Sequence, residues 1–355
     1  DHCYSTPLCT PSRVQIMTGK YNGRNYKSFG YLDPNETTFG HLLQKAGYAT
    51  MIAGKWQLNG ISTLVRLPGW DNNMRPKEAG FDEYSLWQLT KKRSEGERYW
   101  DPLIEENGRV LSEELKGTYG PDHFTDYICD FIERKKDEPF LVYYPMVLVH
   151  DPFVATPDSQ DKNMTGQQAF VDMVAYCDKM VGRIVKKLDD LNLLEHTIIL
   201  FTGDNGTHRS IISYVDDTEI RGGKGTTLDA GTHVALIAYW KDHTPKGLVS
   251  KDLVDFTDFM PTLAEAAGAI SFFPTLQGKE GKKREWIYCH YEPRWGGFKE
   301  ARFARDHRFK LYHDGRFYDI PADFLEKKEI EMQNGEIELK TATREKLQKV
   351  LDSMR

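Results

Sequence analysis

The middle of the chain alternates between two patterns of apolar residues, one typical of amphipathic helices and one typical of buried strands. Apolar side chains recur every three or four positions over residues 167–191, which predicts a long helix there. The same period predicts shorter helices over residues 123–136 and 255–267, and one that ends at Gly47. Near-continuous apolar runs predict buried strands at residues 48–53, 140–149, 197–201 and 233–240. This alternation indicates an α/β fold with a large, mostly parallel sheet between helices.

The pattern changes after Gly268. Residues 269–285 contain Gly, Pro and Lys and have the character of a connector. Short strands are then predicted at residues 285–291, 303–312 and 316–320, and a terminal helix at residues 343–354. We therefore expect a first domain of residues 1–268 and a small C-terminal α+β subdomain of residues 269–355. Residues 60–120 are irregular, so we expect them to form loops over a functional site.

Polar residues repeatedly follow the predicted strands. Lys55 comes after one strand, His150 after another, and Asp204 and Asn205 after a third. In sheets that are buried on both faces, ligands bind beyond the carboxyl ends of the strands. The positions of these residues therefore favour a binding or catalytic site at that edge of the sheet.

Composition excludes some classes of function. The chain has 355 residues, of which 39% are hydrophobic and 28% charged, and a net charge of −6, which argues against general nucleic-acid binding. No apolar run approaches the roughly 20 residues that a membrane span needs. The five cysteines form no spaced framework, so the redox compartment stays open. We expect Cys129 and Cys177 in the core, while the sequence does not decide whether Cys3 pairs with another cysteine.

A short helix is predicted over residues 11–18. Thr10 is a good N-cap, Pro11 suits the first helical position, and Gly19 suits the position after the last turn. Cys9 then lies immediately before the helix, where unpaired backbone N–H groups favour an anion. The pattern therefore points to a reactive side chain beside an anion site, although a half-buried free cysteine before a capped helix is the simpler alternative.

Cys9, Pro11 and Arg13, followed by Thr18 and Gly19, resemble the signature of the type I sulfatases. The resemblance covers about residues 1–320 and implies an alkaline-phosphatase-like fold. It also implies that a maturation enzyme oxidises Cys9 to formylglycine, whose hydrate attacks the sulfur of a sulfate ester. Arg13, one turn further along the helix, would hold that group with a fixed charge.

A second sulfatase signature, Gly-Tyr-x-Thr followed by Gly-Lys-Trp-His, resembles residues 47–57 at all but its last position. The resemblance implies that Lys55 binds the sulfate. Gln57 stands where the family has histidine, and glutamine can hydrogen-bond a hydroxyl but cannot exchange a proton near neutral pH. We therefore expect Gln57 to line the site without an acid or base role.

Two further segments match the family. His150 matches a histidine that contacts the sulfate and can protonate the leaving oxygen. Residues 222–225 resemble a Gly-Gly-Lys-Gly segment, which implies that Lys224 contacts the sulfate. The family then has Gly-Gly-x-Arg-Val-Pro, whereas this chain has His233 in place of the arginine. The sequence leaves open whether His233 lines the site or is structural.

Asp204 and Asn205 match the family's calcium-binding Asp-Asn pair. Their oxygens suit calcium, with magnesium as an alternative. In the family, two more ligands come from an Asp-Asp pair that ends a strand before the signature. No such strand precedes Cys9, so we expect a sequence shortened at its N-terminus that binds metal weakly or not at all. We expect Asp216 and Asp217 to lie in a solvated loop.

The resemblance implies a sulfuric ester hydrolase, with a sulfated small molecule or glycan and the maturation enzyme as partners. It also implies a periplasmic or secreted protein, which the residues themselves do not indicate. We prefer a carbohydrate sulfate as substrate, because aromatic and charged side chains could line a sugar cleft. The candidates are Trp56, Trp70, Trp87, Trp100, Trp295, His290 and Arg294. A phosphate or phosphonate ester hydrolase and a non-catalytic binder of sulfated glycans remain alternatives.

Overall fold

The computed structural model describes residues 1–60, 75–87, 89, 97–111, 113–215, 217–264, 274, 277–281, 283–330 and 337–354. The chain folds into two compact units. The first consists of Asp1–Tyr26, Ile199–Arg209 and Ser213–Arg355, and the second of Lys27–Ile198 and Ser210–Ile212. Each unit therefore combines segments that are distant in the sequence.

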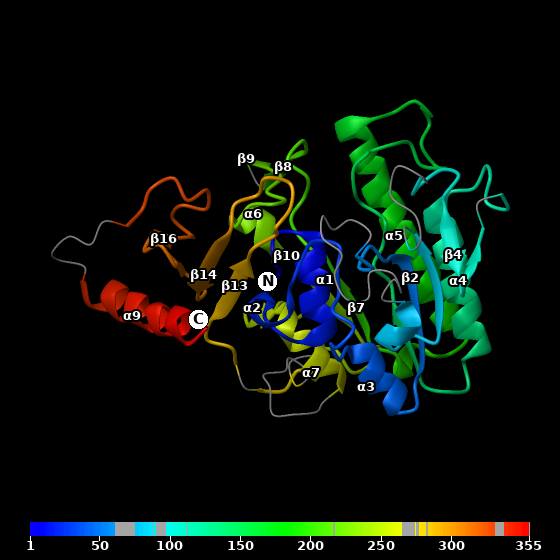
Figure 1. The fold of residues 1–355 in the computed structure, drawn as a ribbon, viewed down its shortest axis with the longest axis horizontal. Helices are drawn as coiled ribbons and strands as arrows, with labels where there is room; N and C mark the ends of the chain where they lie inside the picture. The colour runs from blue at the N-terminus through cyan, green and yellow to red at the C-terminus, as the bar shows by residue number, and fades with distance from the viewer. Residues whose placement is uncertain are drawn as a thin grey trace. The chain divides into compact units, whose positions relative to one another are not determined.

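The second unit is built on a five-stranded sheet (Figure 1). β2 (Ala49–Lys55) lies between β3 (Glu83–Trp87) and β6 (Phe140–Tyr143) and is parallel to both. Beyond β3 the sheet continues antiparallel through β4 (Ile104–Glu106) and β5 (Arg109–Val110). Small and apolar side chains fill most of β2, and all of its residues after the first are buried. The strand therefore ends inside the unit.

Helices pack on this sheet and on each other. α4 (Gly120–Arg134) contacts β2, β3 and α5 (Gly166–Asp190), and α3 (Phe39–Lys45) contacts β2. The buried side of α5 includes Met173, Tyr176 and Met180, whose spacing is that of one helix face. The described part of the unit also contains the short 3-10 turns η1 (Pro76–Ala79) and η3 (Leu194–His196).

The N-terminal strand organises part of the first unit. β1 (His2–Tyr4) pairs antiparallel with β10 (His233–Val234) and parallel with β12 (Leu253–Asp255). β7 (Ile199–Thr202) pairs antiparallel with β11 (Leu236–Tyr239). Among the described residues, this part of the unit contains the helices α1 (Cys9–Thr18), α2 (Asn22–Asn25), α6 (Asp229–Thr232) and α7 (Phe259–Ala264), and the 3-10 turn η4 (Phe256–Asp258). A further two-stranded ribbon consists of β8 (Ile212–Val215) and β9 (Thr218–Arg221).

The C-terminal part of the first unit is a four-stranded antiparallel sheet covered by a helix. α9 (Ile337–Ser353), red in Figure 1, packs on the two middle strands. The strands, in order across the sheet, are β13 (Ile287–Tyr291), β14 (Ala301–Arg305), β15 (Phe309–Tyr312) and β16 (Phe317–Asp319). The core between sheet and helix contains Tyr288, Ala304, Phe309, Leu311, Phe317, Leu347, Val350 and Leu351. This layer depends on apolar burial, so it gives the sheet a rigid support.

The α/β class and the small C-terminal subdomain are confirmed, with sheets of mixed strand direction. The long helix predicted over residues 167–191 is also confirmed, as α5. The predicted domain boundary after Gly268 lies outside the described residues, so the division at that point stays a prediction.

Several predicted elements were wrong in detail. The strand predicted over residues 140–149 ends at Tyr143, and Pro145 follows, which has no N–H to donate to a ladder. The strand predicted over residues 303–312 is the hairpin of β14 and β15, because the Asp306 carboxylate accepts hydrogen bonds from the backbone N–H groups of Arg308 and Phe309.

Two other patterns were misread as well. The strand predicted over residues 233–240 is divided into β10 and β11. Residues 60–120 contain β3, β4 and β5 rather than loops alone. The five cysteines are free thiols; Cys177 is buried as expected, whereas Cys129 is only half-buried.

Candidate functional site

The first group of candidate residues lies around the start of α1, in the first unit. The helix begins at Cys9 itself, with Leu8 as the extended N-cap residue, so the prediction that Thr10 caps the helix was wrong. The Ser12 hydroxyl donates to the carbonyl of Thr6 at 2.8 Å, and the Ser12 N–H donates to the carbonyl of Leu8 at 3.2 Å, which fixes the earlier start. Cys9 therefore lies within the first turn, at the positive end of the helix dipole.

Arg13 lies one turn after Cys9, and both residues are buried. Helix positions four residues apart are on one face, so the guanidinium and the Cys9 side chain occupy the same side of α1. The helix ends at Gly19, whose φ of +63° suits the left-handed cap. This short helix thus carries a candidate nucleophile and a fixed positive charge inside the unit.

Backbone hydrogen bonds join three of the predicted motifs within the first unit. The N–H of Gly225 donates to the carbonyl of Pro7 at 2.8 Å, which places the Lys224 loop against the segment that enters α1. The N–H of Lys224 donates to the carbonyl of Thr207 at 3.0 Å, two residues after Asn205. The structure therefore brings the Cys9 helix, the Lys224 loop and the Asp204–Asn205 turn into one neighbourhood.

The Asp204–Asn205 turn begins two residues after the end of β7. The side-chain amide of Asn205 donates to the carbonyl of Gly206 at 2.9 Å, which orients the side chain. Its Oδ1 atom is shielded from solvent and accepts no hydrogen bond from the described residues. A buried amide oxygen left without a donor fits a cation ligand. Within the described ranges, no group of three or more His, Cys, Asp or Glu side chains is arranged to hold a metal ion.

Two tyrosines that no sequence motif indicated lie near Cys9. Burial raises the pKa values of Tyr26 and Tyr291, and the nearby Cys9 sulfur adds to both shifts. The Tyr291 hydroxyl donates to the carbonyl of Gly225 at 3.3 Å, and the Tyr26 hydroxyl donates to the carbonyl of Pro293 at 2.8 Å. Both phenols therefore stay neutral and act as hydrogen-bond donors beside the Lys224 loop and the segment after β13.

The second group of candidates lies in the second unit. Lys55 is the last residue of β2 rather than the residue after it, and it is buried. Its backbone N–H donates to the carbonyl of Pro145 at 2.8 Å, which continues the pairing of β2 beyond the end of β6. The next segment turns sharply, because Gln57 has a φ of +49°, a left-handed value that is uncommon outside glycine. Lys55 and Gln57 are therefore both fixed at the carboxyl end of β2.

His150 lies seven residues beyond the end of β6, so the prediction that it directly follows a strand was wrong. Its Nδ1 atom is 2.7 Å from the carbonyl oxygen of Asp151 and 3.0 Å from an oxygen of the Asp151 carboxylate. Two acceptors at Nδ1 hold a proton on that nitrogen, so Nε2 is the nitrogen that exchanges protons with a ligand. Tyr99, which no motif indicated, holds the His150 backbone through its hydroxyl.

His233 has a structural place in the first unit. It lies on β10 opposite Tyr4, and the two rings stack with centroids 4.9 Å apart. Asp216 lies outside the described residues, so the predicted Asp216–Asp217 loop stays a prediction.

The aromatic candidates for a sugar cleft differ in exposure. Trp56 and Trp87 are fully buried and belong to the core, which excludes them as a sugar surface. Trp100 is half-buried and donates from Nε1 to the carbonyl of Ala155 at 2.9 Å. Trp295 is 45% exposed, and Trp70 lies outside the described residues. Of the tryptophans that the structure describes, Trp295 is thus the one best placed to meet a ligand.

None of the helices in the described part of the chain combines the length and apolar character that a membrane span requires.

Comparison with known proteins agrees with the motifs. The Sulfatase family model matches residues 1–269. Human arylsulfatase A is 28% identical over 305 residues, which cover 76% of this chain and 57% of that protein. Human N-acetylgalactosamine-6-sulfatase is 26% identical over 301 residues, which cover 74% of this chain and 54% of that protein. The chain thus spans little more than half the length of these relatives.

Solved structures show the same fold. One was determined in complex with its substrate, D-glucosamine-2-N,6-O-disulfate; it has a TM-score of 0.76 and 20% identity, over 100% of this chain and 90% of that chain. Another, of Ps i-CgsB in complex with a neocarrahexaose, has a TM-score of 0.74 and 21% identity, over 98% of this chain and 83% of that chain. The family model covers more than half of the sequence, and the chain belongs to the sulfatase family.

Proposed function

We propose that this chain hydrolyses the sulfate ester of a sulfated carbohydrate, using formylglycine made from Cys9. The observation that carries the proposal is the neighbourhood of Cys9, Arg13 and Lys224. The Cys-x-Pro-x-Arg sequence forms the first turns of α1, and a 2.8 Å backbone hydrogen bond joins Gly225 to Pro7, the second residue before Cys9. A maturation enzyme that reads this sequence would be a necessary partner.

The residues of the first unit would bind and activate the ester. When present, formylglycine supplies, as its hydrate, one hydroxyl that attacks sulfur and a second that later expels sulfate. Arg13 provides a fixed charge on the same helix face, and the N–H groups of the first turn of α1 favour the anion. Lys224 offers an ammonium from a loop whose backbone is fixed at both Lys224 and Gly225. Preorganised charges of this kind stabilise the transition state.

The resemblance assigns three further roles to residues of the second unit. Nδ1 of His150 keeps its proton and donates it in a hydrogen bond to Asp151, so the imidazolium form of His150 can donate the Nε2 proton to the leaving oxygen. Lys55 would bind a sulfate oxygen as a point charge. Gln57 can hydrogen-bond a substrate hydroxyl, but it cannot take part in proton transfer.

Asp204 and Asn205 would hold a divalent cation, calcium in preference to magnesium. The orphaned Oδ1 atom of Asn205 fits this role. When bound, the ion supplies positive charge near the nucleophile. Two ligands alone bind such an ion weakly, so we propose weak metal binding by these residues on their own.

A carbohydrate substrate is favoured by the chemistry of relatives and by Trp295. One relative is named N-acetylgalactosamine-6-sulfatase, and two structural neighbours were solved with a sugar or oligosaccharide ligand. Trp295 offers an exposed indole in the segment after β13, as a sugar ring requires for stacking.

The test is intact-mass analysis of the Cys9 peptide after co-expression with a formylglycine-generating enzyme, followed by measurement of sulfate release. We expect an aldehyde or its hydrate at Cys9, and release of sulfate that the Cys9→Ala variant does not show. An unmodified thiol, or equal release by Cys9→Ala, would refute the proposal. Faster turnover of an aryl phosphate than of an aryl sulfate would instead favour a phosphate or phosphonate ester hydrolase.

Gln57 favours a second candidate function, the binding of sulfated glycans without catalysis. The family's histidine at this position is replaced by a side chain that cannot exchange protons. Glycan binding by a matured protein that releases no sulfate would support this candidate.

A further inference from the structure

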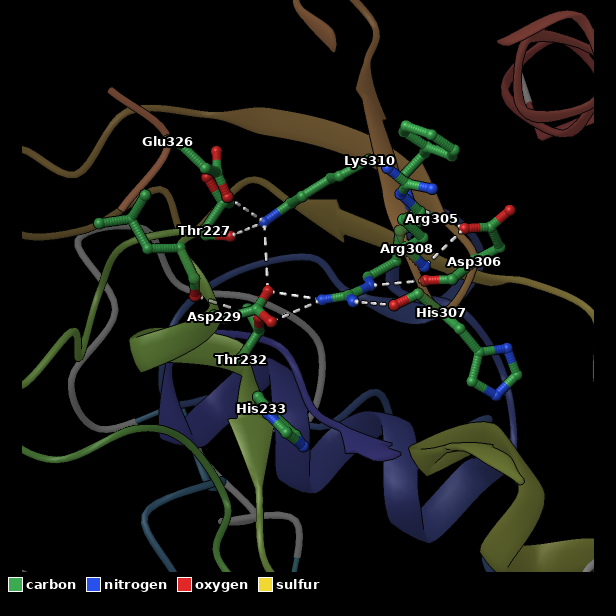
Figure 2. Close-up of polar contacts among 12 residues, drawn as sticks. Thr227, Asp229, Thr232, His233, Arg305, Asp306, His307, Arg308, Lys310 and Glu326 are labelled. Carbon is green, nitrogen blue, oxygen red and sulfur yellow. Dashed lines mark hydrogen bonds and ion pairs between the residues drawn. The ribbon is translucent and has the colours of Figure 1, made fainter. Parts of the chain in front are cut away.

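Four charged side chains form a buried network between the C-terminal sheet and the segment that follows Lys224 (Figure 2). Asp229, Arg305 and Lys310 are 3%, 2% and 0% exposed, and the Glu326 side chain is equally well covered. Nη1 of Arg305 lies 2.6 and 2.7 Å from the two carboxylate oxygens of Asp229. Nζ of Lys310 lies 2.8 Å from Oε1 of Glu326 and 4.0 Å from Asp229. Two cations therefore balance two anions away from water.

The charges in this network depend on one another. Burial alone would raise the pKa of Asp229, but the charges of Arg305 and Lys310 outweigh it and hold that pKa below its usual value. Asp229 is thus an anion at neutral pH. Loss of one partner from a buried ion pair leaves an uncompensated charge, which strongly destabilises the local arrangement.

Asp229 is the first residue of α6, and α6 is the surface on which two site loops pack. The N–H of Gly206 donates to the carbonyl of Gly231 at 2.9 Å, directly after the Asp204–Asn205 turn. A Cβ atom at Gly206 would lie 1.9 Å from the carbonyl oxygen of Ala230, and one at Gly223 would lie 2.5 Å from the carbonyl carbon of the same residue. The backbones on either side of α6 therefore approach it too closely for any side chain, so a shift of α6 moves both loops.

The segment between Lys224 and α6 has further attachments to the same network. Lys310 donates a short hydrogen bond to the carbonyl of Thr227. The Tyr312 hydroxyl is 3.0 Å from the Thr227 hydroxyl and donates to Glu326 at 2.7 Å. Residues 227 and 229 are thus both fixed to β15 and β14, which are themselves supported by α9.

We propose that Arg305 and Lys310 are positioning residues for the anion site, holding α6, and through it the Lys224 loop and the Asp204–Asn205 turn, in place. The inference rests on the proposed function of Lys224 as a sulfate ligand. Side chains that orient ligand-binding residues without touching the ligand commonly affect affinity or activity by about 10- to 100-fold. A site displaced by 1 Å loses activity on the same scale.

The test compares Arg305→Lys with Arg308→Lys. Arg305 uses Nη1 for Asp229 and also donates from Nε to the carbonyl of Asp306 at 3.0 Å, which one ammonium cannot reproduce. Arg308 belongs to the same hairpin and pairs with Asp319 at 2.6 Å, without a contact to α6 among its described partners. Both variants therefore keep the positive charge and lose the geometry of the guanidinium. Of the two arginines, Arg305 is the one whose described partners include a residue of α6.

The readouts are the dissociation constant for inorganic sulfate and kcat/KM for a sulfate ester, at a temperature at which all variants are folded. We expect Arg305→Lys to weaken sulfate binding and lower kcat/KM by about 10- to 100-fold, and Arg308→Lys to change each by less than about twofold. An Arg305→Lys protein that melts earlier but binds and turns over sulfate like the wild type would overturn the inference.

A milder variant keeps the test decisive if Arg305→Lys does not fold. Tyr312→Phe removes only the hydroxyl that joins Thr227 to Glu326, and we expect it to weaken sulfate binding by about 3- to 10-fold. Unchanged binding in Tyr312→Phe would then overturn the inference. A wild-type protein that neither binds nor releases sulfate would refute the proposed function itself, whereas an active wild type with unaffected variants would refute only the positioning role.

Discussion

The hydroxyl of Tyr99 lies 2.5 Å from the backbone carbonyl oxygen of His150 and accepts a hydrogen bond from the backbone N–H of the same residue at 3.2 Å. It is also 3.0 Å from the carbonyl oxygen of Val147. Tyr99 is buried, and burial raises its pKa to about 12, so the hydroxyl keeps its proton. One phenol therefore fixes the backbone on which the proposed proton donor is mounted.

Tyr99→Phe should impair both stability and turnover. Removing the hydroxyl leaves partly buried backbone groups of His150 without this partner, which costs about 1–3 kcal/mol in the free energy of unfolding. Because the imidazole loses its support, we expect kcat to fall by about tenfold while KM changes little. Urea unfolding and steady-state kinetics with a sulfate ester measure the two effects.

Tyr127→Phe is the matched control for Tyr99→Phe. Tyr127 is in the same unit, and its hydroxyl accepts from Asn107 at 2.9 Å and donates to Glu83 at 3.4 Å, away from His150. We expect it to lower stability without an effect on kcat. Equal loss of kcat in both variants would contradict a specific role for Tyr99.

The parts of the fold that could be predicted were those with a long or regular pattern. α5 repeats its apolar period over 25 residues, and β2 is a continuous buried strand. β4 was missed because Glu105 is buried in it, and its carboxylate is satisfied by Arg75 at 2.8 Å and the Tyr84 hydroxyl at 2.8 Å. A charged residue in the sequence predicts an exposed position, and its burial can be recognised only when its partners, which are distant in the sequence, are known.

The candidate site shows the same division. Cys9, Lys55 and Lys224 lie in motifs and could be named from the sequence. The bonds that bring motifs together, such as the one from Gly225 to Pro7, join backbone atoms more than 200 residues apart and leave no trace in residue type. Arg305 and Tyr99 have no motif, because their role comes entirely from what they contact.

Two buried carboxylates beneath α1 predict an unusual dependence of stability on pH. The Asp255 carboxylate accepts from the Gln15 side chain at 2.8 Å, and Asp258 pairs with Arg284, with Nε 2.9 Å from its oxygen. Burial outweighs the charge of Arg284 and raises the pKa of Asp255 to about 6. Burial also raises the pKa of Asp258. In the unfolded chain an aspartate has a pKa of 3.8. Between these values the native state binds more protons than the unfolded state.

Because the native state holds the extra proton, the contribution of Asp255 to stability is fully present below about pH 4 and is lost as pH rises through about 6. Asp255→Asn should remove the part of the fall that comes from Asp255 and leave the part that comes from Asp258, since an amide oxygen still accepts from Gln15 and does not ionise. Urea unfolding of wild type and variant at several pH values between 4 and 7 would measure the slope. Asp242→Asn, at an exposed carboxylate, should leave the slope unchanged. A wild-type slope retained in Asp255→Asn would show that Asp255 is not its source.

Gln57→His should raise activity. Histidine is one of the residues that accept a left-handed backbone most readily, so the φ of +49° at this position presents no added obstacle. The variant places an imidazole where the family has one, and we expect kcat to rise by about tenfold or more. The pH–rate profile should gain an ionisation near 6.5. Gln57→Asn also suits the backbone but cannot exchange a proton, so a gain shared by both variants would contradict this explanation.

The Trp295→Ala variant should distinguish a glycan substrate from a small aryl sulfate. Its ring stacks on Phe298 with centroids 6.0 Å apart. A Cβ atom added to Gly225, the residue after Lys224, would lie 2.2 Å from Phe298. The ring of Phe298 therefore lies between the exposed indole and the Lys224 loop. Covering such a side chain with a sugar ring contributes about 1.5–3 kcal/mol, which corresponds to roughly 10- to 100-fold in KM. Trp295→Ala should therefore raise KM for a sulfated oligosaccharide by that factor and leave kcat/KM for an aryl sulfate within about threefold. Leu248→Ala, an exposed apolar side chain elsewhere in the first unit, should change neither value. If both substrates lost activity together in Trp295→Ala, the indole would support the Lys224 loop rather than bind a sugar, and the substrate would have to be recognised by other residues.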